Sequence, residues 1–211
     1  MLRFFMAACA ALFVASSATA TTLSANLQGD NEYTIYMSTD DGTAGTEFGS
    51  GINWSIMGSH AIALTPGVTN YLHVYVYDVG PPLAGLLGEF TLSSTDFEFA
   101  NGSQTLLTGD SALRVSQTGW ENYVATNNVA PHGGHLWGWR ADDEISDDAF
   151  WVWNGGSASG AENFFSAEIA YVGDTQLLPD SPAAVPLPAS VLLLGGGLGA
   201  LVVARRRRRA V

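Results

Sequence analysis

Turn-forming residues divide the central part of this sequence into short pieces. Between residues 22 and 178, Gly, Asn, Asp, Ser and Thr interrupt apolar runs about every ten residues, as in sandwich and barrel sequences. Within these runs apolar and polar side chains alternate, for example over 33–37 and 165–171. Alternation is the period of a half-buried strand, and no long segment has the 3.6-residue period of a helix. We therefore predict an all-β domain over residues 21–178, an antiparallel β-sandwich.

The segment 71–79 is expected to be the longest strand and to lie in the middle of a sheet. A turn over 64–70 precedes it, and Pro81 and Pro82 follow it, since proline cannot continue a central strand. One face of the segment is aliphatic, and the other carries four rings: Tyr71, His73, Tyr75 and Tyr77. This second face must be covered by loops or must meet a ligand.

Residues 33–90 bear a loose resemblance to galactose-binding-like jelly-roll domains. The matching elements are the Gly-x-x-Trp of 51–54, the turn and Tyr-rich strand of 64–79, and the Gly-rich return of 85–90. The resemblance implies that the β-sandwich is jelly-roll-like. Because the motifs are short, it does not by itself imply sugar binding.

The N-terminus has the pattern of a secretory signal peptide. Arg3 supplies the positive charge, residues 4–14 supply the apolar core, and Ala18-Thr19-Ala20 is a small-residue cleavage site. We predict that signal peptidase removes residues 1–20. The single cysteine, Cys9, lies within this segment. The exported chain would therefore have no disulfide and no thiol chemistry.

The C-terminus has three parts in sequence. Residues 179–190 form a linker with four prolines, and the last two, Pro186 and Pro188, would keep the chain ahead of the apolar residues extended. A helix over the apolar residues 189–204 would be roughly 24 Å long, slightly short of a ~30 Å hydrocarbon core. Five arginines follow, and the positive-inside rule would keep them on the cytoplasmic side: Arg205, Arg206, Arg207, Arg208 and Arg209. We predict a transmembrane helix with an Arg-rich tail over residues 191–211.

This arrangement closely resembles the VPLPA-CTERM variant of the PEP-CTERM sorting signals of Gram-negative bacteria. The motif residues are Val185, Pro186, Leu187, Pro188, Ala189 and Ser190. The resemblance implies that a membrane-embedded exosortase recognises the motif and removes the anchor. An inner-membrane-anchored precursor would then become a cell-surface or extracellular protein. Families with this tail are associated with exopolysaccharide and biofilm-type material, which implies an extracellular polysaccharide as a partner.

The central domain is strongly acidic. All 20 acidic residues lie between Asp30 and Asp180, whereas most of the eight basic residues lie in the two end segments. Only Arg114 and Arg140 remain in the domain, and the chain has no lysine. Binding to nucleic acid depends on neutralising phosphates, so this composition excludes a nucleic-acid partner.

The second half of the domain is rich in tryptophan. Four of these residues form two pairs at a spacing of two: Trp137 with Trp139, and Trp151 with Trp153. We expect at least one pair in the core, where tryptophan is usually found, whereas the other could stack on sugar rings. The candidate ligand-binding residues are Trp137 and Trp139 with the neighbouring His135 and Arg140. The guanidinium of Arg140 could bind a carboxylate or sulfate on a polymer.

Five carboxylates lie close together in one acidic segment: Asp142, Asp143, Glu144, Asp147 and Asp148. Calcium takes six to eight oxygen ligands without a rigid motif, so a structural Ca²⁺ is one hypothesis. The spacing does not match an EF-hand, and a solvated loop is the alternative. His132 and His135 lack the further ligands that a zinc site needs, and a Gly-rich loop explains them better.

No motif in the sequence indicates catalysis. There is no GxSxG element, no P-loop and no nucleophilic cysteine in the exported part, and no carboxylate pair for glycoside hydrolysis stands out. We therefore expect a non-catalytic, exported surface or matrix protein associated with exopolysaccharide. A specific carbohydrate-binding module and a secreted glycosidase or lyase are the alternatives.

Overall fold

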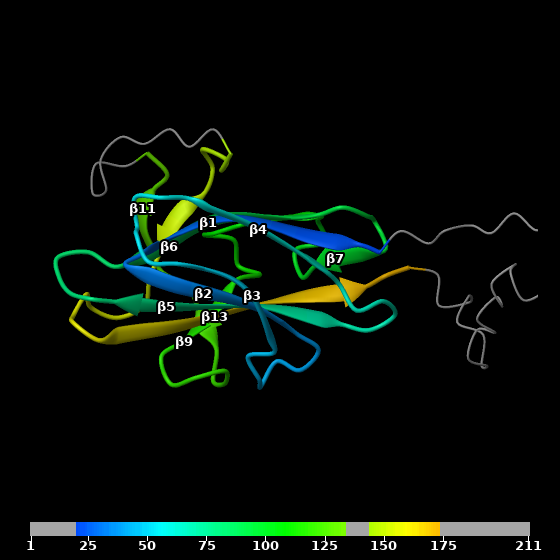
Figure 1. Ribbon diagram of the computed structural model, residues 1–211, viewed down its shortest axis with the longest axis horizontal. Helices are drawn as coiled ribbons and strands as arrows, with labels where there is room; N and C mark the ends of the chain where they lie inside the picture. The colour runs from blue at the N-terminus through cyan, green and yellow to red at the C-terminus, as the bar shows by residue number, and fades with distance from the viewer. Residues whose placement is uncertain (1–19, 134–143, 174–211) are drawn as a thin grey trace, which may run out of the picture. The chain divides into compact units, whose positions relative to one another are not determined.

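The computed structural model describes residues 20–133 and 144–173, and these residues form β-strands and no helix (Figure 1). The strands are β1 (Thr22–Asp30), β2 (Glu32–Ser38), β3 (Thr46–Gly51), β4 (Gly58–Ala63), β5 (Asn70–Asp78), β6 (Gly85–Leu92), β7 (Phe97–Phe99), β8 (Thr105–Leu107), β9 (Arg114–Ser116), β10 (Val124–Ala125), β11 (Asn128–Pro131), β12 (Phe150–Val152) and β13 (Ala161–Tyr171). The all-β prediction is confirmed.

The strands form two antiparallel sheets that lie in two layers (Figure 1). The six-stranded sheet has the order β11-β12-β6-β1-β4, with β8 also paired to β6. The seven-stranded sheet has the order β10-β9-β13-β5-β2-β3, with β7 also paired to β13. Two facing antiparallel sheets give the sandwich-like architecture that the turn spacing predicts.

The hydrophobic core lies between the two sheets, and each sheet contributes alternate side chains. From β1 and β2 these are Leu23, Ala25, Leu27, Tyr33, Ile35 and Met37. The largest fully buried side chains include four phenylalanines: Phe90, Phe97, Phe99 and Phe165. Burying a side chain of this size stabilises the fold by about 1.5–3 kcal/mol. The period-two pattern of the sequence therefore identifies the buried face of these strands correctly.

β5 is a central strand, as its sequence predicts, with β13 on one side and β2 on the other. Its aliphatic side chains Leu72, Val74 and Val76 are fully buried, so its ring-bearing face points away from the six-stranded sheet. The prediction that this is the longest strand is wrong, since β13 has 11 residues and β5 has nine. β13 is longer because β5 pairs with it over residues 161–169 and β7 continues the pairing over 169–171.

The turn ahead of β5 is held by the side chain of Asn70. Its amide oxygen accepts a hydrogen bond of 2.9 Å from the backbone N–H of Thr65. Its amide nitrogen donates to the carbonyl oxygens of Thr65 at 2.9 Å and Val68 at 3.0 Å. An asparagine that satisfies three backbone groups fixes the direction in which the strand leaves the turn.

Trp151 and Trp153 are both buried, as expected for at least one tryptophan pair. They do not share neighbours, however. Trp153 packs in the main core, whereas Trp151 belongs to a second cluster with Leu87, Ala130, Ile145 and Ala149. The two tryptophans therefore pack in different apolar clusters, Trp151 from within β12 and Trp153 from just beyond its end at Val152.

The sorting motif at 185–190, the predicted transmembrane helix and the arginines at 205–209 lie outside the described residues, as do residues 1–19 of the signal peptide. Within residues 20–133 and 144–173, no helix has the length and apolar character needed to cross a membrane.

Candidate functional site

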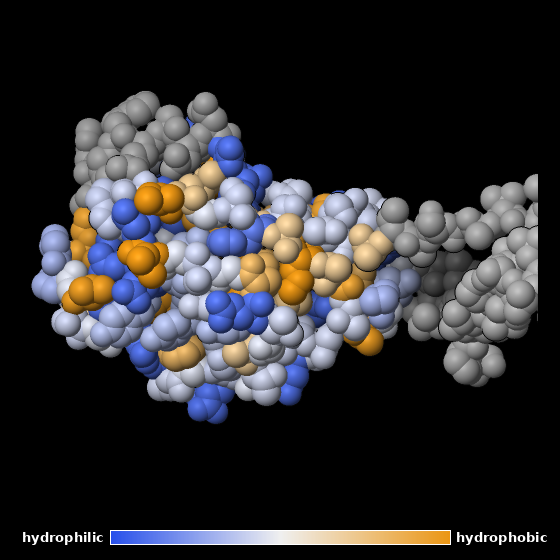
Figure 2. Space-filling view, viewed as in Figure 1, coloured by the Kyte–Doolittle hydropathy of each residue, from blue (hydrophilic) through white to orange (hydrophobic). Residues whose placement is uncertain are grey.

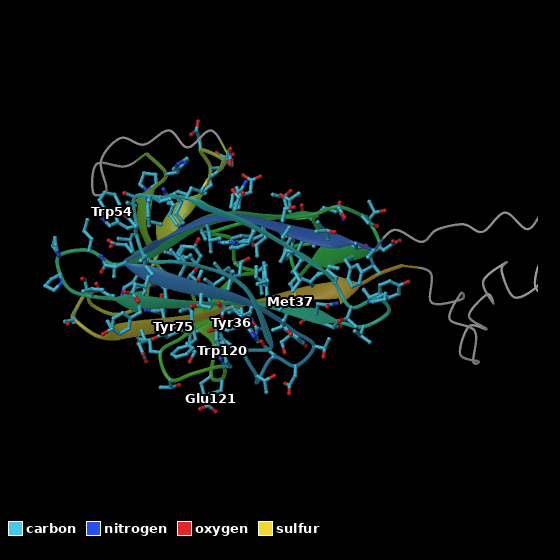
Figure 3. The ribbon with its side chains drawn as sticks, viewed as in Figure 1. Tyr36, Met37, Trp54, Tyr75, Trp120 and Glu121 are labelled. Carbon is cyan, nitrogen blue, oxygen red and sulfur yellow. The ribbon has the colours of Figure 1, made fainter. Side chains whose placement is uncertain are left out.

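The outer face of the seven-stranded sheet carries a group of aromatic side chains, which we call the aromatic face. Its rings come from β2, β5, β13 and the segment 117–123: Tyr36, Tyr71, His73, Tyr75, Tyr77, Phe164, Trp120 and Tyr123. On each strand they alternate with core residues and therefore point away from the core. Figure 3 shows Tyr36, Tyr75 and Trp120 on this side of the sheet. All of the rings except His73 are half-buried, so ring surface remains open to solvent.

Trp120 occupies the centre of the aromatic face. Its indole lies nearly parallel to the imidazole of His73, with ring centroids 4.5 Å apart and an interplanar angle of 24°. The edges of the indole meet Tyr36 at 6.1 Å and Phe164 at 5.1 Å in T-shaped contacts. Such offset or edge-to-face arrangements are favoured by the ring quadrupoles. The side chain of Trp120 is half-buried, so part of the indole remains open to solvent.

Asp41, in the loop between β2 and β3, links this loop to the sheet beneath it. Its Oδ1 atom accepts hydrogen bonds from Ser166 Oγ at 2.5 Å and from His73 Nε2 at 3.3 Å. Its Oδ2 atom accepts from Arg114 Nη2 at 3.0 Å. The phenol of Tyr123 donates to the Asp41 carbonyl oxygen at 3.0 Å. These partners come from separate parts of the chain, so Asp41 fixes the loop over the edge of the aromatic face.

The surroundings of Asp41 also set the pKa values of two side chains. Partial burial raises the pKa of Asp41, but the hydrogen bonds from Ser166, His73 and Arg114 outweigh it and hold the pKa below the usual 3.8. Partial burial and the Asp41 charge raise the pKa of Tyr123 to about 12. The carboxylate is therefore held ionised and the phenol protonated at neutral pH.

Ser166, His73 and Asp41 are the residue types of a hydrolytic triad, but their arrangement differs from one. In a triad the histidine lies between serine and acid, where it takes the serine proton. Here Ser166 Oγ and His73 Nε2 both contact the same atom, Asp41 Oδ1. Ser166 and His73 are also fully buried, which closes the hydroxyl off from a substrate. The arrangement holds the loop in place and does not form a nucleophile.

Glutamates lie beside the tyrosines of the aromatic face. Across the strand pairs, Glu168 is opposite Tyr71 and Glu47 is opposite Tyr36. Tyr77 lies between two glutamates, Glu32 on β2 and Glu162 on β13. The phenol of Tyr75 donates a hydrogen bond of 2.6 Å to Glu162 Oε1. Burial and this hydrogen bond both raise the pKa of Tyr75 above its usual value. The rim of the aromatic face is therefore acidic.

Apart from the aromatic face, a hollow of about 350 Å³ lies at one end of the domain. It is lined by Asp30, Asn31, Trp54, Gly80, Pro81, Pro82 and Leu83. The loops on either side expose the apolar side chains of Ile52, Ile56 and Val79. Figure 2 shows apolar surface, interrupted by hydrophilic residues, at the left end of the viewed face. Among the described lining residues only Asp30 is titratable, so the hollow does not assemble an acid–base pair.

Most of the site residues proposed from sequence lie outside the described residues. These are His135, Trp137, Trp139, Arg140, Asp142 and Asp143. Of the remaining acidic candidates, Asp147 and Glu144 are exposed, and Asp148 lines a shallow hollow of about 380 Å³ with Asp110. Within the described part of the chain no three metal-ligating side chains come together. The calcium hypothesis stays a prediction, because two of its five carboxylates are not described.

The sequence pointed to half of the aromatic face. The alternation in 71–77 predicts a ring-bearing outer face that needs a cover or a ligand, and the structure shows loops over part of it. Sequence reasoning missed the contribution of Trp120 and Asp41. Neither residue lies in a strand, so no periodic signal placed it over His73.

Comparison of the chain with protein-family models, with curated proteins and with solved structures found no match. The fold and the site define an all-β, two-sheet domain whose larger sheet presents a half-exposed aromatic face.

Proposed function

We propose that this chain is an exported, exosortase-processed cell-surface or extracellular-matrix protein whose all-β domain contacts extracellular polysaccharide and carries out no catalysis. The signal-peptide pattern and the resemblance of residues 185–209 to VPLPA-CTERM signals support the export route. Signal peptidase and exosortase are then its processing enzymes. The aromatic face supports the contact with polysaccharide. The loose resemblance of residues 33–90 to galactose-binding-like domains favours a jelly-roll arrangement of the two sheets.

The observation that carries this proposal is the half-exposed indole of Trp120, which lies among tyrosines that are also half-exposed. Sugar rings present C–H groups on their faces, and these stack on aromatic rings. Tyr71 and Tyr77 lie six residues apart on β5, which is roughly 20 Å along a strand. A surface of this length suits an extended polymer better than a single small molecule, which normally binds in a deep pocket.

The aromatic face is also held in shape before any ligand binds. Trp120 rests on His73 and is flanked by Tyr36 and Phe164, which restricts its rotamers. Rings that are already ordered lose little conformational entropy on binding, so more of the contact energy appears as affinity. The ordered, half-exposed rings therefore favour a role of this face in binding over that of an ordinary solvent-exposed surface.

Co-sedimentation with the polysaccharide of the producing cells tests this function. The variant is Trp120→Ala, and the control is Phe150→Ala, which removes a half-buried ring from the other sheet. We expect Trp120→Ala to stay folded at the assay temperature but no longer to co-sediment with the polymer. For Phe150→Ala, co-sedimentation should fall only in proportion to the fraction of protein that has unfolded. Retention of the polymer by folded Trp120→Ala would contradict the proposal. Defined oligosaccharides in the same assay separate a specific binding module from a general matrix protein.

A further inference from the structure

We infer that the aromatic face selects glycans that carry protonated amino groups, such as partly de-N-acetylated amino-sugar polymers. This inference rests on the proposed function and names the chemical class of its ligand. It rests on two observations. Carboxylates lie beside the rings of the aromatic face, and the neighbouring cation, Arg114, is already paired with Asp41.

The cation of this surface is already neutralised. Among the residues that the structure describes, Arg114 is the one arginine, and the chain has no lysine. Arg114 is bound to Asp41 Oδ2 at 3.0 Å, and its guanidinium carbon lies 5.0 Å from the ring centroid of Tyr123. The charge of Arg114 is therefore already compensated by Asp41 when a polymer approaches. The described residues of this face therefore offer no independent cation to a uronate or sulfate.

The carboxylates, in contrast, are distributed along the whole row of rings. Tyr71 has Glu168 as its cross-strand neighbour, Tyr77 has Glu32 and Glu162, and Tyr36 has Glu47. Residues directly opposite on neighbouring strands have Cβ atoms about 4.5–5.5 Å apart. A sugar ring stacked on one of these tyrosines therefore lies within reach of a glutamate.

An ammonium group fits this surface in two ways. It is attracted to the negative face of an aromatic ring, and it pairs with a carboxylate through charge-assisted hydrogen bonds. A neutral sugar gains only the stacking and neutral hydrogen bonds. A sugar with its own carboxylate is repelled by the glutamates, because like charges brought together at an interface oppose binding. The charge pattern thus ranks amino, neutral and acidic glycans in that order.

A comparison of three oligosaccharides tests this ranking, with the full chain kept in detergent. The probes are a glucosamine oligomer with free amino groups, the same oligomer after complete N-acetylation, and a uronic acid oligomer of equal length. Affinities are measured by titration calorimetry at low salt below neutral pH. We expect the free-amine oligomer to bind at least about tenfold more tightly than its acetylated form, and this preference to weaken with added salt.

Two variants test whether the glutamates of the aromatic face cause the preference for the free-amine oligomer. The double variant Glu162→Gln with Glu168→Gln should bring the affinities for the amine and acetylated oligomers closer together. Glu144→Gln, an exposed charge change on a loop away from the seven-stranded sheet, should leave their ratio as it is. Melting temperatures of all variants verify that they fold.

The outcomes separate this inference from the proposed function. No binding of any of the three oligomers and none of the producer's polysaccharide would overturn both. Equal binding of amine and acetylated oligomers, tighter binding of the uronic acid oligomer, or an unchanged ratio in the double glutamine variant would overturn the inference alone. A dimer in sedimentation velocity that Trp120→Ala converts to a monomer would show that a second copy covers the face, and would overturn both.

Discussion

The hydroxyl of Ser166 donates a hydrogen bond of 2.5 Å to the carboxylate of Asp41, a residue 125 positions earlier in the chain. The contact joins the loop after β2 to the middle of β13. Arg114 and His73 add contacts from β9 and β5 to the same carboxylate. Three strands and one loop are therefore tied together at the edge of the aromatic face by one acidic side chain.

Replacing that carboxylate should destabilise the fold. Asp41→Asn keeps the shape of the side chain but removes the charge that Arg114, His73 and Ser166 contact. We expect a loss of about 1–3 kcal/mol in the free energy of unfolding, the range for losing a partner in charge-assisted hydrogen bonds. Urea denaturation measures it. Asp148→Asn, at an exposed carboxylate, serves as the control and should change stability by less than about 0.5 kcal/mol. Equal effects of the two substitutions would show that the Asp41 contacts add nothing.

The contribution of Asp41 should also depend on pH. Its pKa in the folded state lies below 3.8, because the three hydrogen bonds outweigh the effect of burial. A carboxyl with a lowered pKa stabilises the fold above its unfolded-state pKa, and this stabilisation is lost as the pH falls through the folded-state pKa. We expect the stability difference between the unmodified chain and Asp41→Asn to be largest above about pH 5 and to shrink steadily below about pH 4. Urea titrations across this range check it, and a difference that grows on acidification would refute the assignment.

The strands could be predicted from the sequence because their signal is local. In β2, β5 and β13 the side-chain alternation follows from burial of one face, so 33–37, 71–77 and 165–171 reveal both the strand and its inner side. The outward position of the four rings on β5 follows from the same rule.

The centre of the site could not be predicted in this way. The stack of Trp120 on His73 joins a loop to a strand far away in the sequence, and the bond of Ser166 to Asp41 does the same. Such contacts depend on how the sheets order their strands, which no local period encodes. The tryptophans at 137 and 139 can be selected from the sequence, because their spacing of two is visible there. The position of Trp120 over the sheet has no such local signal.

The loop that carries Asp41 depends on a glycine at its end. Gly45 has a φ angle of +86°, and a Cβ atom there would collide with the carbonyl of Met37 and the Cα of Ser38. Gly102 also has a positive φ, of +74°, but has open space around it. We expect Gly102→Ala to cost about 1–2 kcal/mol from backbone conformation alone, and Gly45→Ala to cost clearly more. Thermal unfolding of both variants measures the difference, and equal costs would show that the collision is relieved without strain.

The C-terminal segment should act as a temporary anchor. On the sequence pattern, Pro186 and Pro188 would keep the segment ahead of the apolar residues extended, as a processing enzyme requires of its substrate, and the arginines at 205–209 would stop transfer through the membrane. We expect mass spectrometry of the extracellular form to place its C-terminus within or next to residues 185–190. A variant with Pro186→Ala and Pro188→Ala should accumulate in the membrane fraction with its arginine tail intact. The matched control, Pro179→Ala with Pro182→Ala in the preceding linker, should be processed normally. Recovery of intact residues 205–211 from the extracellular protein would show that the segment is not removed.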